Sequence, residues 1–404
     1  MPDPLNAVMH GGQLDDAPVV VYVRQLLEQA VALRASDVHF EPYEQHYRVR
    51  MRLDGELHEV AQAPLALRER LAARIKVLAR LDVAEKRLPQ DGRIQFRLGD
   101  GRELDLRIST LPTLFGEKVV VRVLDARLSE LDLAVLGYEP DELAHLLAAI
   151  RRPHGMVLVT GPTGSGKTQS LYACLHLLNT VGVNIATVED PCEIQMPGIN
   201  QVNVQDKPGL SFAVALRAFL RQDPDILMVG EIRDLETAQI AVQAAQTGHL
   251  VLSTLHTNDA PATLTRLRNM GIAPYNLAAS VSLITAQRLV RKLCPHCRQA
   301  VRLPSGVWRE AAGEQGAPAP EGPVFVPQGC AQCHKGFKGR TGLFQVMPVS
   351  EALQELILQD ASSLALARQA QSEGVRSLRQ AGLRKVLAGV TSLDEVLAVT
   401  RDRA

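Results

Sequence analysis

One short run of residues restricts the fold of this chain more than any other feature. Residues 161–168 read GPTGSGKT and match the phosphate-loop pattern G-x-x-x-x-G-K-[ST] at every fixed position. Apolar residues 156–159 before the run predict a buried strand, and residues 170–178 after it follow a helical pattern. A strand, a glycine-rich turn and a helix in this order predict a nucleoside triphosphate site on an α/β sheet.

Each part of the run has a chemical task. Glycines let backbone N–H groups close around phosphate oxygens, and the N-terminus of the following helix favours anions. We expect Lys167 to reach the β- and γ-phosphates of ATP and Thr168 to hold Mg²⁺. The expected nucleotide-binding residues are Gly161, Pro162, Thr163, Gly164, Ser165, Gly166, Lys167 and Thr168.

Length and charge narrow the class of protein. The chain has 404 residues, enough for two or three domains, and its 44 basic residues balance 44 acidic ones. Bulk charge therefore gives no support to a nucleic-acid-binding protein. No apolar run approaches the ~20 residues that span a bilayer, and the N-terminus lacks a signal-peptide pattern, so we expect a soluble intracellular protein. In that compartment the six cysteines are not expected to form disulfides.

The spacing of apolar residues changes along the sequence, and these changes divide the chain into domains. Alternating apolar residues predict antiparallel strands near 38–40, 47–53, 57–60, 93–98, 103–109 and 118–124, with an Asp54-Gly55 hairpin turn. Later strands alternate with helices, which predicts a parallel sheet with strands at 156–160, 184–188, 225–229 and 249–254. We expect six segments: a linker (1–16), an α+β domain (17–127), a hinge (128–142), an ATPase domain (143–293), a tetracysteine segment (294–345) and a helical C-terminal region (346–404).

A second phosphate-site element is the run ILMVGEIRD at residues 226–234. Four apolar residues followed by an acid indicate a Walker B strand, which normally ends in a magnesium-binding Asp. Here Gly230 precedes Glu231, so the acid comes one residue later and is one methylene longer. We expect Glu231 to be the general base for the attacking water or a magnesium ligand. The alternative is a surface acid after a buried strand.

Two further strand ends carry polar groups. Glu189 begins the acidic cluster EDPCE, in which Pro191 ends the strand; we expect this carboxylate at the ligand crevice, and the alternative is a solvated acidic turn. His249 and His256 flank an apolar run and are candidate γ-phosphate sensors. Their spacing of seven places them on opposite faces of a continuous strand, so they should have different tasks and should not share a zinc ion.

Four cysteines have metal-ligand spacing. Cys294 and Cys297 form one C-x₂-C pair, and Cys330 and Cys333 form a second. Two such pairs predict a structural zinc ion held by four thiolates, although the gap between them is longer than usual. The segment has little apolar core of its own, so we expect the metal to stabilise its fold.

Four blocks in this order carry a resemblance: GPTGSGKT, TVEDPCE, ILMVGEIRD and TGHLVLSTLHTNDA. They resemble the Walker A, Asp box, atypical Walker B and His box of the secretion ATPase superfamily, which serves type II secretion, type IV pili and DNA uptake. The resemblance extends over nearly the whole chain. It implies a RecA-like P-loop ATPase domain joined to a smaller, PAS-like N-terminal domain, with a zinc-binding insertion.

The family also implies an assembly and its partners. It implies a homohexamer that binds ATP between domains, with arginines donated to the phosphates by the smaller domain. The positions of this sequence that match those arginines are Arg93 and Arg107, and Arg122 is a weaker candidate. The alternative for each arginine is surface salt bridging. Expected partners are an inner-membrane platform protein and cytoplasmic pilus or secretion components, with no specific nucleic acid. The protein would lie in the cytoplasm, peripheral to the bacterial inner membrane.

The resemblance also favours one function within the superfamily over the others. Retraction motors lack the tetracysteine site, and INQVNVQDKPGLSFAVALRAFLRQDPDILMVGEIRD looks more like the pilus assembly ATPases than the type II secretion ATPases. We therefore expect a motor for pilin polymerisation, with type II secretion as the alternative. A DNA-uptake or nucleic-acid translocase is the third interpretation. The fourth is a nucleotide-binding scaffold that does not hydrolyse ATP, which would be expected if Lys167 or Glu231 were missing, and both are present. Family members usually carry a further N-terminal domain before an acidic linker, and this chain starts inside what resembles that linker, at residues 15–18. We expect either a natural short form or a shortened chain.

Overall fold

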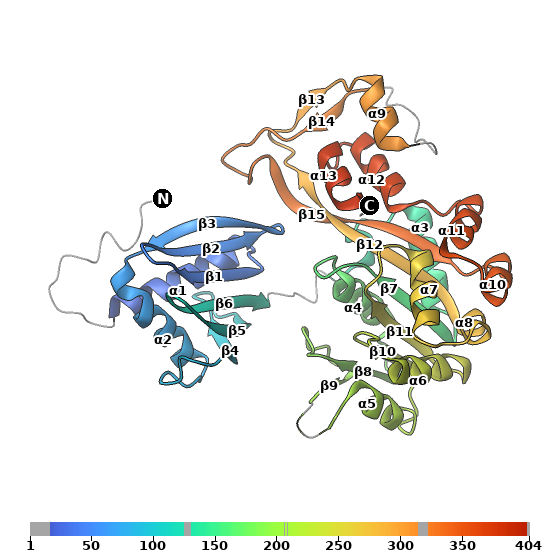
Figure 1. The fold of residues 1–404 in the computed structure, drawn as a ribbon, viewed down its shortest axis with the longest axis horizontal. Coiled ribbons are helices and arrows are strands. Elements are labelled where there is room, and N and C mark those ends of the chain that lie inside the picture. The colour runs from blue at the N-terminus through green and yellow to red at the C-terminus, as the bar shows by residue number, and fades with distance from the viewer. Residues whose placement is uncertain (1–16, 125–130, 206, 208, 314–321, 402–404) are drawn as a thin grey trace. The chain divides into compact units, whose positions relative to one another are not determined.

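The chain folds into two compact units, Met1–Ala126 and Arg127–Ala404. The computed structural model describes residues 17–124, 131–205, 207, 209–313 and 322–401, drawn in colour in Figure 1. The expected linker, residues 1–16, and the start of the expected hinge lie outside the described residues.

The first unit is one six-stranded sheet with two helices. The antiparallel strand order is β3-β2-β1-β6-β5-β4, and the helices α1 and α2 pack their apolar side chains on one face of the sheet. The elements are α1 (Ala17–Ala32), β1 (Asp37–Pro42), β2 (Tyr47–Leu53), β3 (Glu56–Ala63), the 3₁₀ turn η2 (Leu65–Leu67), α2 (Arg68–Leu78), β4 (Gln90–Arg97), β5 (Glu103–Thr113) and β6 (Gly116–Leu124).

The predicted alternation explains this sheet. In β2, every second residue from Tyr47 to Leu53 is buried and the arginines between them are half-buried. Asp54 and Gly55 both have positive φ, 49° and 95°, as a tight hairpin with the right-handed twist of its strands requires. The expected Asp-Gly turn is therefore confirmed, as are all six expected strands.

The second unit is a seven-stranded sheet with helices on both faces (Figure 1). The strand order is β15-β12-β7-β11-β10-β8-β9, in which only β15 runs antiparallel to its neighbour. The strands are β7 (Gly155–Thr160), β8 (Ile185–Glu189), β9 (Asn200–Asn203), β10 (Ile226–Val229), β11 (Leu250–Leu255), β12 (Val281–Leu293) and β15 (Phe337–Pro348). The four expected strands are confirmed as β7, β8, β10 and β11, whereas β9, β12 and β15 were not predicted.

Alternate residues of each buried strand supply two apolar layers. In β7, Met156 and Leu158 pack toward one layer of helices, and Val157 and Val159 pack toward the other. The helical elements are η4 (Leu133–Val135), α3 (Pro140–Ile150), α4 (Lys167–Leu178), α5 (Phe212–Phe219), α6 (Leu235–Gln246), α7 (Ala260–Asn269), α8 (Pro274–Ser280), α10 (Glu351–Leu358), α11 (Ser363–Ser372), α12 (Leu378–Leu387) and α13 (Leu393–Thr400). The last four confirm the expected helical pattern after residue 351.

The cysteine-bearing segment packs on the C-terminal helices. It contains the two-stranded sheet β13 (Gln299–Val301) and β14 (Val324–Val326) and the helix α9 (Ser305–Ala312). Trp308 of α9 is 2% exposed and belongs to one apolar cluster with Leu383 and Val386 of α12. The apolar side chains of this segment therefore share a core with the C-terminal helices α12 and α13, instead of forming a core within the segment. Among the helices that the structure describes, none is long and apolar enough to cross a membrane.

A buried ion pair in the first unit gives a test of its stability. Lys76 is fully buried, and its Nζ donates to Glu117 Oε1 at 2.7 Å and to the Glu85 carbonyl at 2.6 Å. Lys76→Met leaves the Glu117 carboxylate buried without its partner, which should cost about 3 kcal/mol. Hydrogen exchange of the amides in β5 and β6 measures this loss for the unit that carries the pair.

The chain offers a matched control. Lys86 forms an exposed ion pair with Glu69 at 3.0 Å, so Lys86→Met should change the same exchange free energy by less than about 1 kcal/mol. The double variant Lys76→Met/Glu117→Gln should recover part of the loss, because it removes the unpaired charge. Equal losses of exchange free energy in Lys76→Met and Lys86→Met would contradict the conclusion that the buried pair stabilises this unit more than the exposed pair does.

Candidate active site and metal centre

The phosphate loop lies between β7 and α4, as the sequence predicts. Gly164 and Gly166 have φ values of 78° and 87°, a backbone region that favours glycine, and Gly166 is the N-cap of α4. The Nζ of Lys167 donates to the carbonyls of Gly161 at 2.9 Å and Pro162 at 3.1 Å. Thr168 follows as the second residue of α4 and is half-buried. The loop therefore has the strand, turn and helix that a phosphate site requires.

Glu231 lies among charged side chains from three strand ends. Its Oε1 accepts a hydrogen bond from Arg233 Nη2 at 2.5 Å, and its Oε2 lies 3.5 Å from His256 Nε2. Arg233 also reaches Asp190, with 3.2 Å between Nη1 and Oδ2. The acidic cluster after β8, the acid after β10 and the histidine after β11 are therefore joined in one network, as expected for carboxyl ends of parallel strands.

Electrostatics keep this carboxylate charged. The hydrogen bond from Arg233 holds the pKa of Glu231 below its usual value, against the opposing effect of burial, and the charges of Arg233, His256 and Lys167 add to the lowering. Burial lowers the pKa of Lys167, while the charge of Glu231 raises it. Glu231 is thus an ionised carboxylate at neutral pH, the form that can accept a proton.

The unusual position of Glu231 has a structural reason. Gly230 continues the pairing of β10 with β8, because its N–H donates to the Val188 carbonyl at 2.8 Å. A Cβ at Gly230 would lie 3.3 Å from that carbonyl oxygen and 3.4 Å from the Cα of Glu189, which is tighter than most side-chain contacts. A glycine at this point lets the chain run one residue further before the acid.

Glu189 is placed differently from Glu231. It is 4% exposed, and its carboxylate accepts hydrogen bonds from Tyr172 of α4, from Thr187 at 2.6 Å and from Gln201 at 3.2 Å. Three donors hold it inside the protein, so it ties α4 to the sheet below the phosphate loop. The next residue, Asp190, is the member of the acidic cluster that joins the Glu231 network.

The two histidines lie at opposite ends of β11. His256 follows Leu255, which is paired with Thr160 immediately before the phosphate loop. The His249 carbonyl accepts from the N–H of Gly155 at the other end of β7, and its Nδ1 lies 3.0 Å from the Ala244 carbonyl. Of the two candidates, the structure brings only His256 to the edge that carries Glu231 and Lys167.

Two functional candidates were missed by the sequence analysis because β12 was not predicted. Gln287 and Arg288 follow Ala286, which is paired with Thr160 of β7. Gln287 Nε2 donates to the Ser165 carbonyl at 2.6 Å, and Arg288 Nη2 donates to the Asn258 carbonyl at 2.9 Å. The positive charge of Arg288 also lowers the pKa of Lys167. The sequence signal that could have found them is the polar pair at 287–288 directly after the mostly apolar residues 281–286.

The predicted arginines form a row across the first unit. Arg93 of β4 is paired with Arg107 of β5, and Arg107 is paired with Arg122 of β6. Directly paired residues of antiparallel strands share one face, so the three guanidinium groups lie on the same face of this sheet. Arg122 Nε donates to Asp37 Oδ1 of β1 at 3.1 Å, which continues the row.

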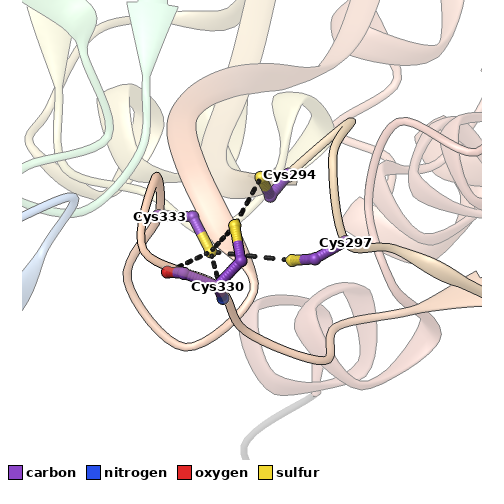
Figure 2. A group of neighbouring side chains, drawn as sticks. All are labelled: Cys294, Cys297, Cys330 and Cys333. Carbon is purple, nitrogen blue, oxygen red and sulfur yellow. Dashed lines mark hydrogen bonds between the residues drawn. The ribbon is translucent and has the colours of Figure 1, made fainter.

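The four cysteines come together as the sequence predicts (Figure 2). Their sulfur atoms all lie within 4.8 Å of one another, with 3.9 Å between Cys294 and Cys330 and 3.6 Å between Cys297 and Cys333. Four thiolates about 2.3 Å from a tetrahedral zinc ion would be about 3.8 Å apart, so the arrangement fits zinc. The Gly329 N–H donates to the Cys297 sulfur at 3.3 Å, a bond that favours the thiolate form.

The chain is similar in sequence to proteins of one family. The chain matches the protein family described as type II/IV secretion system protein over residues 12–398. The type IV pilus assembly ATPase PilB of Pseudomonas aeruginosa is 54% identical over 393 residues, covering 96% of this chain and 69% of that protein. The type II secretion system protein E of Dickeya dadantii is 48% identical over 389 residues, covering 96% of this chain and 77% of that protein.

A solved structure agrees on the fold. The ATPase DotB of Legionella pneumophila has a TM-score of 0.68 against this chain at 20% identity, covering 94% of this chain and 95% of that one. This similarity supports an α/β ATPase fold of the RecA-like kind, joined to a smaller unit. The family match extends over nearly the whole chain and includes the phosphate loop, Glu231 and the four cysteines. The chain therefore belongs to the family of type II/IV secretion system proteins.

Proposed function

We propose that this protein is an ATP-hydrolysing motor that powers type IV pilus assembly. The observation that carries the proposal is the 54% identity to a pilus assembly ATPase across 96% of the chain, combined with an intact Lys167 and Glu231 site. Relatives in type II secretion are 48% identical and define the alternative, a motor for protein export. The neutral charge balance gives no support to a nucleic-acid translocase.

The site suggests how its residues divide the work on ATP. The Nζ of Lys167, now bonded to two loop carbonyls, would turn to the β- and γ-phosphates, and Thr168 would hold Mg²⁺. Mg²⁺ would neutralise phosphate charge when bound. Glu231 would accept the proton of the attacking water, and Arg233 would keep it ionised. His256 lies near enough to Glu231 to sense the γ-phosphate, and Glu189 would hold α4 in place.

The first unit would contribute arginine side chains to the bound ATP, and several copies of the chain would assemble into a ring. Arg93 and Arg107, on one face of a PAS-like unit, would neutralise charge that develops on the phosphates during transfer. We expect a homohexamer in which this unit closes over bound ATP. Closure around the ring would move an inner-membrane platform protein and cytoplasmic pilus components, with the motor on the cytoplasmic face. The expected hinge at residues 128–142 would allow this movement.

The cysteine cluster would hold a structural zinc ion. The four sulfurs offer a closed tetrahedral donor set, which leaves no position for substrate. Zinc would fix the two chain segments that carry Cys294–Cys297 and Cys330–Cys333 against the end of β12. Catalysis would not pass through this metal.

The first test separates nucleotide binding from chemistry. Lys167→Ala should weaken ATP binding, and Glu231→Gln should keep binding but slow hydrolysis about 100-fold or more, the range for loss of a general base. In cells that carry only the Glu231→Gln protein, surface pili should be lost while protein secretion continues. Glu236→Gln, which removes an exposed acid on α6, is the control and should hydrolyse ATP normally. Wild-type hydrolysis by Glu231→Gln would remove Glu231 as the base, and lost secretion with intact pili would favour the export motor.

The second test concerns zinc. Metal analysis should find about one zinc ion per chain, and Cys330→Ser should lose it with a lower melting temperature. Cys174→Ala changes a buried thiol outside the cluster and should keep its zinc. A zinc-free Cys330→Ser protein as stable as the wild type would show that the metal is not structural.

The third test asks where the arginines act. Arg93→Ala or Arg107→Ala should still bind ATP and form rings but hydrolyse about 10³-fold more slowly, as for loss of an arginine donor. Arg97→Ala, on the same strand and paired with Glu103, is the control and should be nearly neutral. Mixing either variant with Lys167→Ala protein should restore some activity if the arginines serve a neighbouring chain. Mixed rings without recovery would mean that the arginines serve their own chain or are structural.

A further inference from the structure

A buried glutamine is bonded both to the phosphate loop and to the helix that follows it. Gln287 is 2% exposed, its Nε2 donates to the Ser165 carbonyl at 2.6 Å, and its Oε1 accepts from the Ser170 hydroxyl at 2.8 Å. The amide orientation is unambiguous, because a carbonyl oxygen can only accept a hydrogen bond. Ser165 lies in the loop and Ser170 in the first turns of α4, so one side chain joins the loop to the helix.

The backbone of the loop also packs tightly against Gln287. A Cβ at Gly161 would lie 2.5 Å from the Gln287 carbonyl oxygen, and a Cβ at Gly166 would lie 3.1 Å from its Nε2. The first and third glycines of the loop therefore have a steric reason beyond their positive φ values: they let Gln287 approach. This contact follows from the register of β12 with β7, in which Ala286 is paired with Thr160.

The hydrogen bond to Ser165 has a consequence for phosphate binding. In a trans peptide unit the C=O and the N–H of the next residue point in opposite directions. When Gln287 holds the Ser165 carbonyl on the β12 side, the N–H of Gly166 must point away from β12. Phosphate loops bind anions through such N–H groups, so the orientation of this peptide determines one of the donors.

We propose that Gln287 is a positioning residue that orients the Ser165–Gly166 peptide for phosphate binding. This inference rests on the proposed ATP site. It assigns a role to a residue of β12, a strand that carries none of the sequence motifs. Gln287 acts through Ser165, and its effect is on the affinity for the nucleotide phosphates. A buried glutamine that only stabilised the fold would affect melting without changing that affinity.

The test compares variants that remove different bonds. Gln287→Met keeps the side-chain length and removes both hydrogen bonds, whereas Ser170→Ala removes only the bond to α4. Gln287→Met should raise the Kd for ADP and the KM for ATP about tenfold, the effect of one well-placed hydrogen bond. Ser170→Ala should leave both values within about twofold of the wild type. The measurements are titration with a fluorescent ADP analogue, steady-state hydrolysis and thermal melting.

A buried glutamine on the neighbouring strand provides the matched control. Gln345 of β15 accepts a hydrogen bond from the Ala260 N–H at 2.9 Å, so Gln345→Met should lower the melting temperature without changing the Kd for ADP. If Gln287→Met does not fold, Gln287→Asn shortens the amide while keeping it polar, and it should show the same rise in Kd. Either Gln287 variant with wild-type ADP affinity, or an equal rise for Ser170→Ala, would overturn the proposal.

The outcomes distinguish this inference from the proposed function. A wild-type protein that binds ADP but does not hydrolyse ATP would contradict the motor, while the ADP titrations would still decide the role of Gln287. A wild-type protein that hydrolyses ATP and a Gln287→Met protein with unchanged Kd and KM would overturn only the positioning role. A wild-type protein that binds no ADP would overturn both.

Discussion

The parallel alignment of the strands of the second unit is the constraint on which its site depends. Because β8, β10, β11 and β7 run in the same direction, their carboxyl ends lie at one edge of the sheet. Segments that lie 22 to 95 residues apart in the sequence therefore deliver Asp190, Glu231, His256 and the phosphate loop to one place. Apolar layers on both faces of the sheet bury these strands along their whole length.

Arg233 organises the charges at this edge. It lies between Glu231 and Asp190, two carboxylates that would otherwise repel each other, and it keeps the pKa of Glu231 low. Lys167 and Arg288 add positive charge on the phosphate-loop side. The edge therefore carries an ionised carboxylate next to several cations.

The strand β12 connects features that are separate in the sequence. Gln287 of β12 donates to Ser165 of the phosphate loop, and Arg288 donates to the carbonyl of Asn258. The last residue of β12, Leu293, directly precedes Cys294. The N–H of Leu293 donates to the Val390 carbonyl, and Arg291 pairs with Glu395 of α13, so the end of the strand is held by the C-terminal helices. The cysteine cluster thus follows the end of a strand whose middle lies beside the phosphate loop.

Local patterns determined much of this protein. The alternation of residues 47–53, the Asp54-Gly55 turn and the GPTGSGKT run each act over a few residues, so the sequence alone predicted the hairpin and the phosphate loop. The two C-x₂-C pairs also predicted that the four cysteines come together. The three arginines were named from the resemblance, but their common row follows from strand register. Tertiary structure alone decided that Glu189 is buried against Tyr172 and that Gln287 reaches Ser165. These positions depend on which strands are neighbours, and pairing between distant segments leaves no periodic trace in either segment.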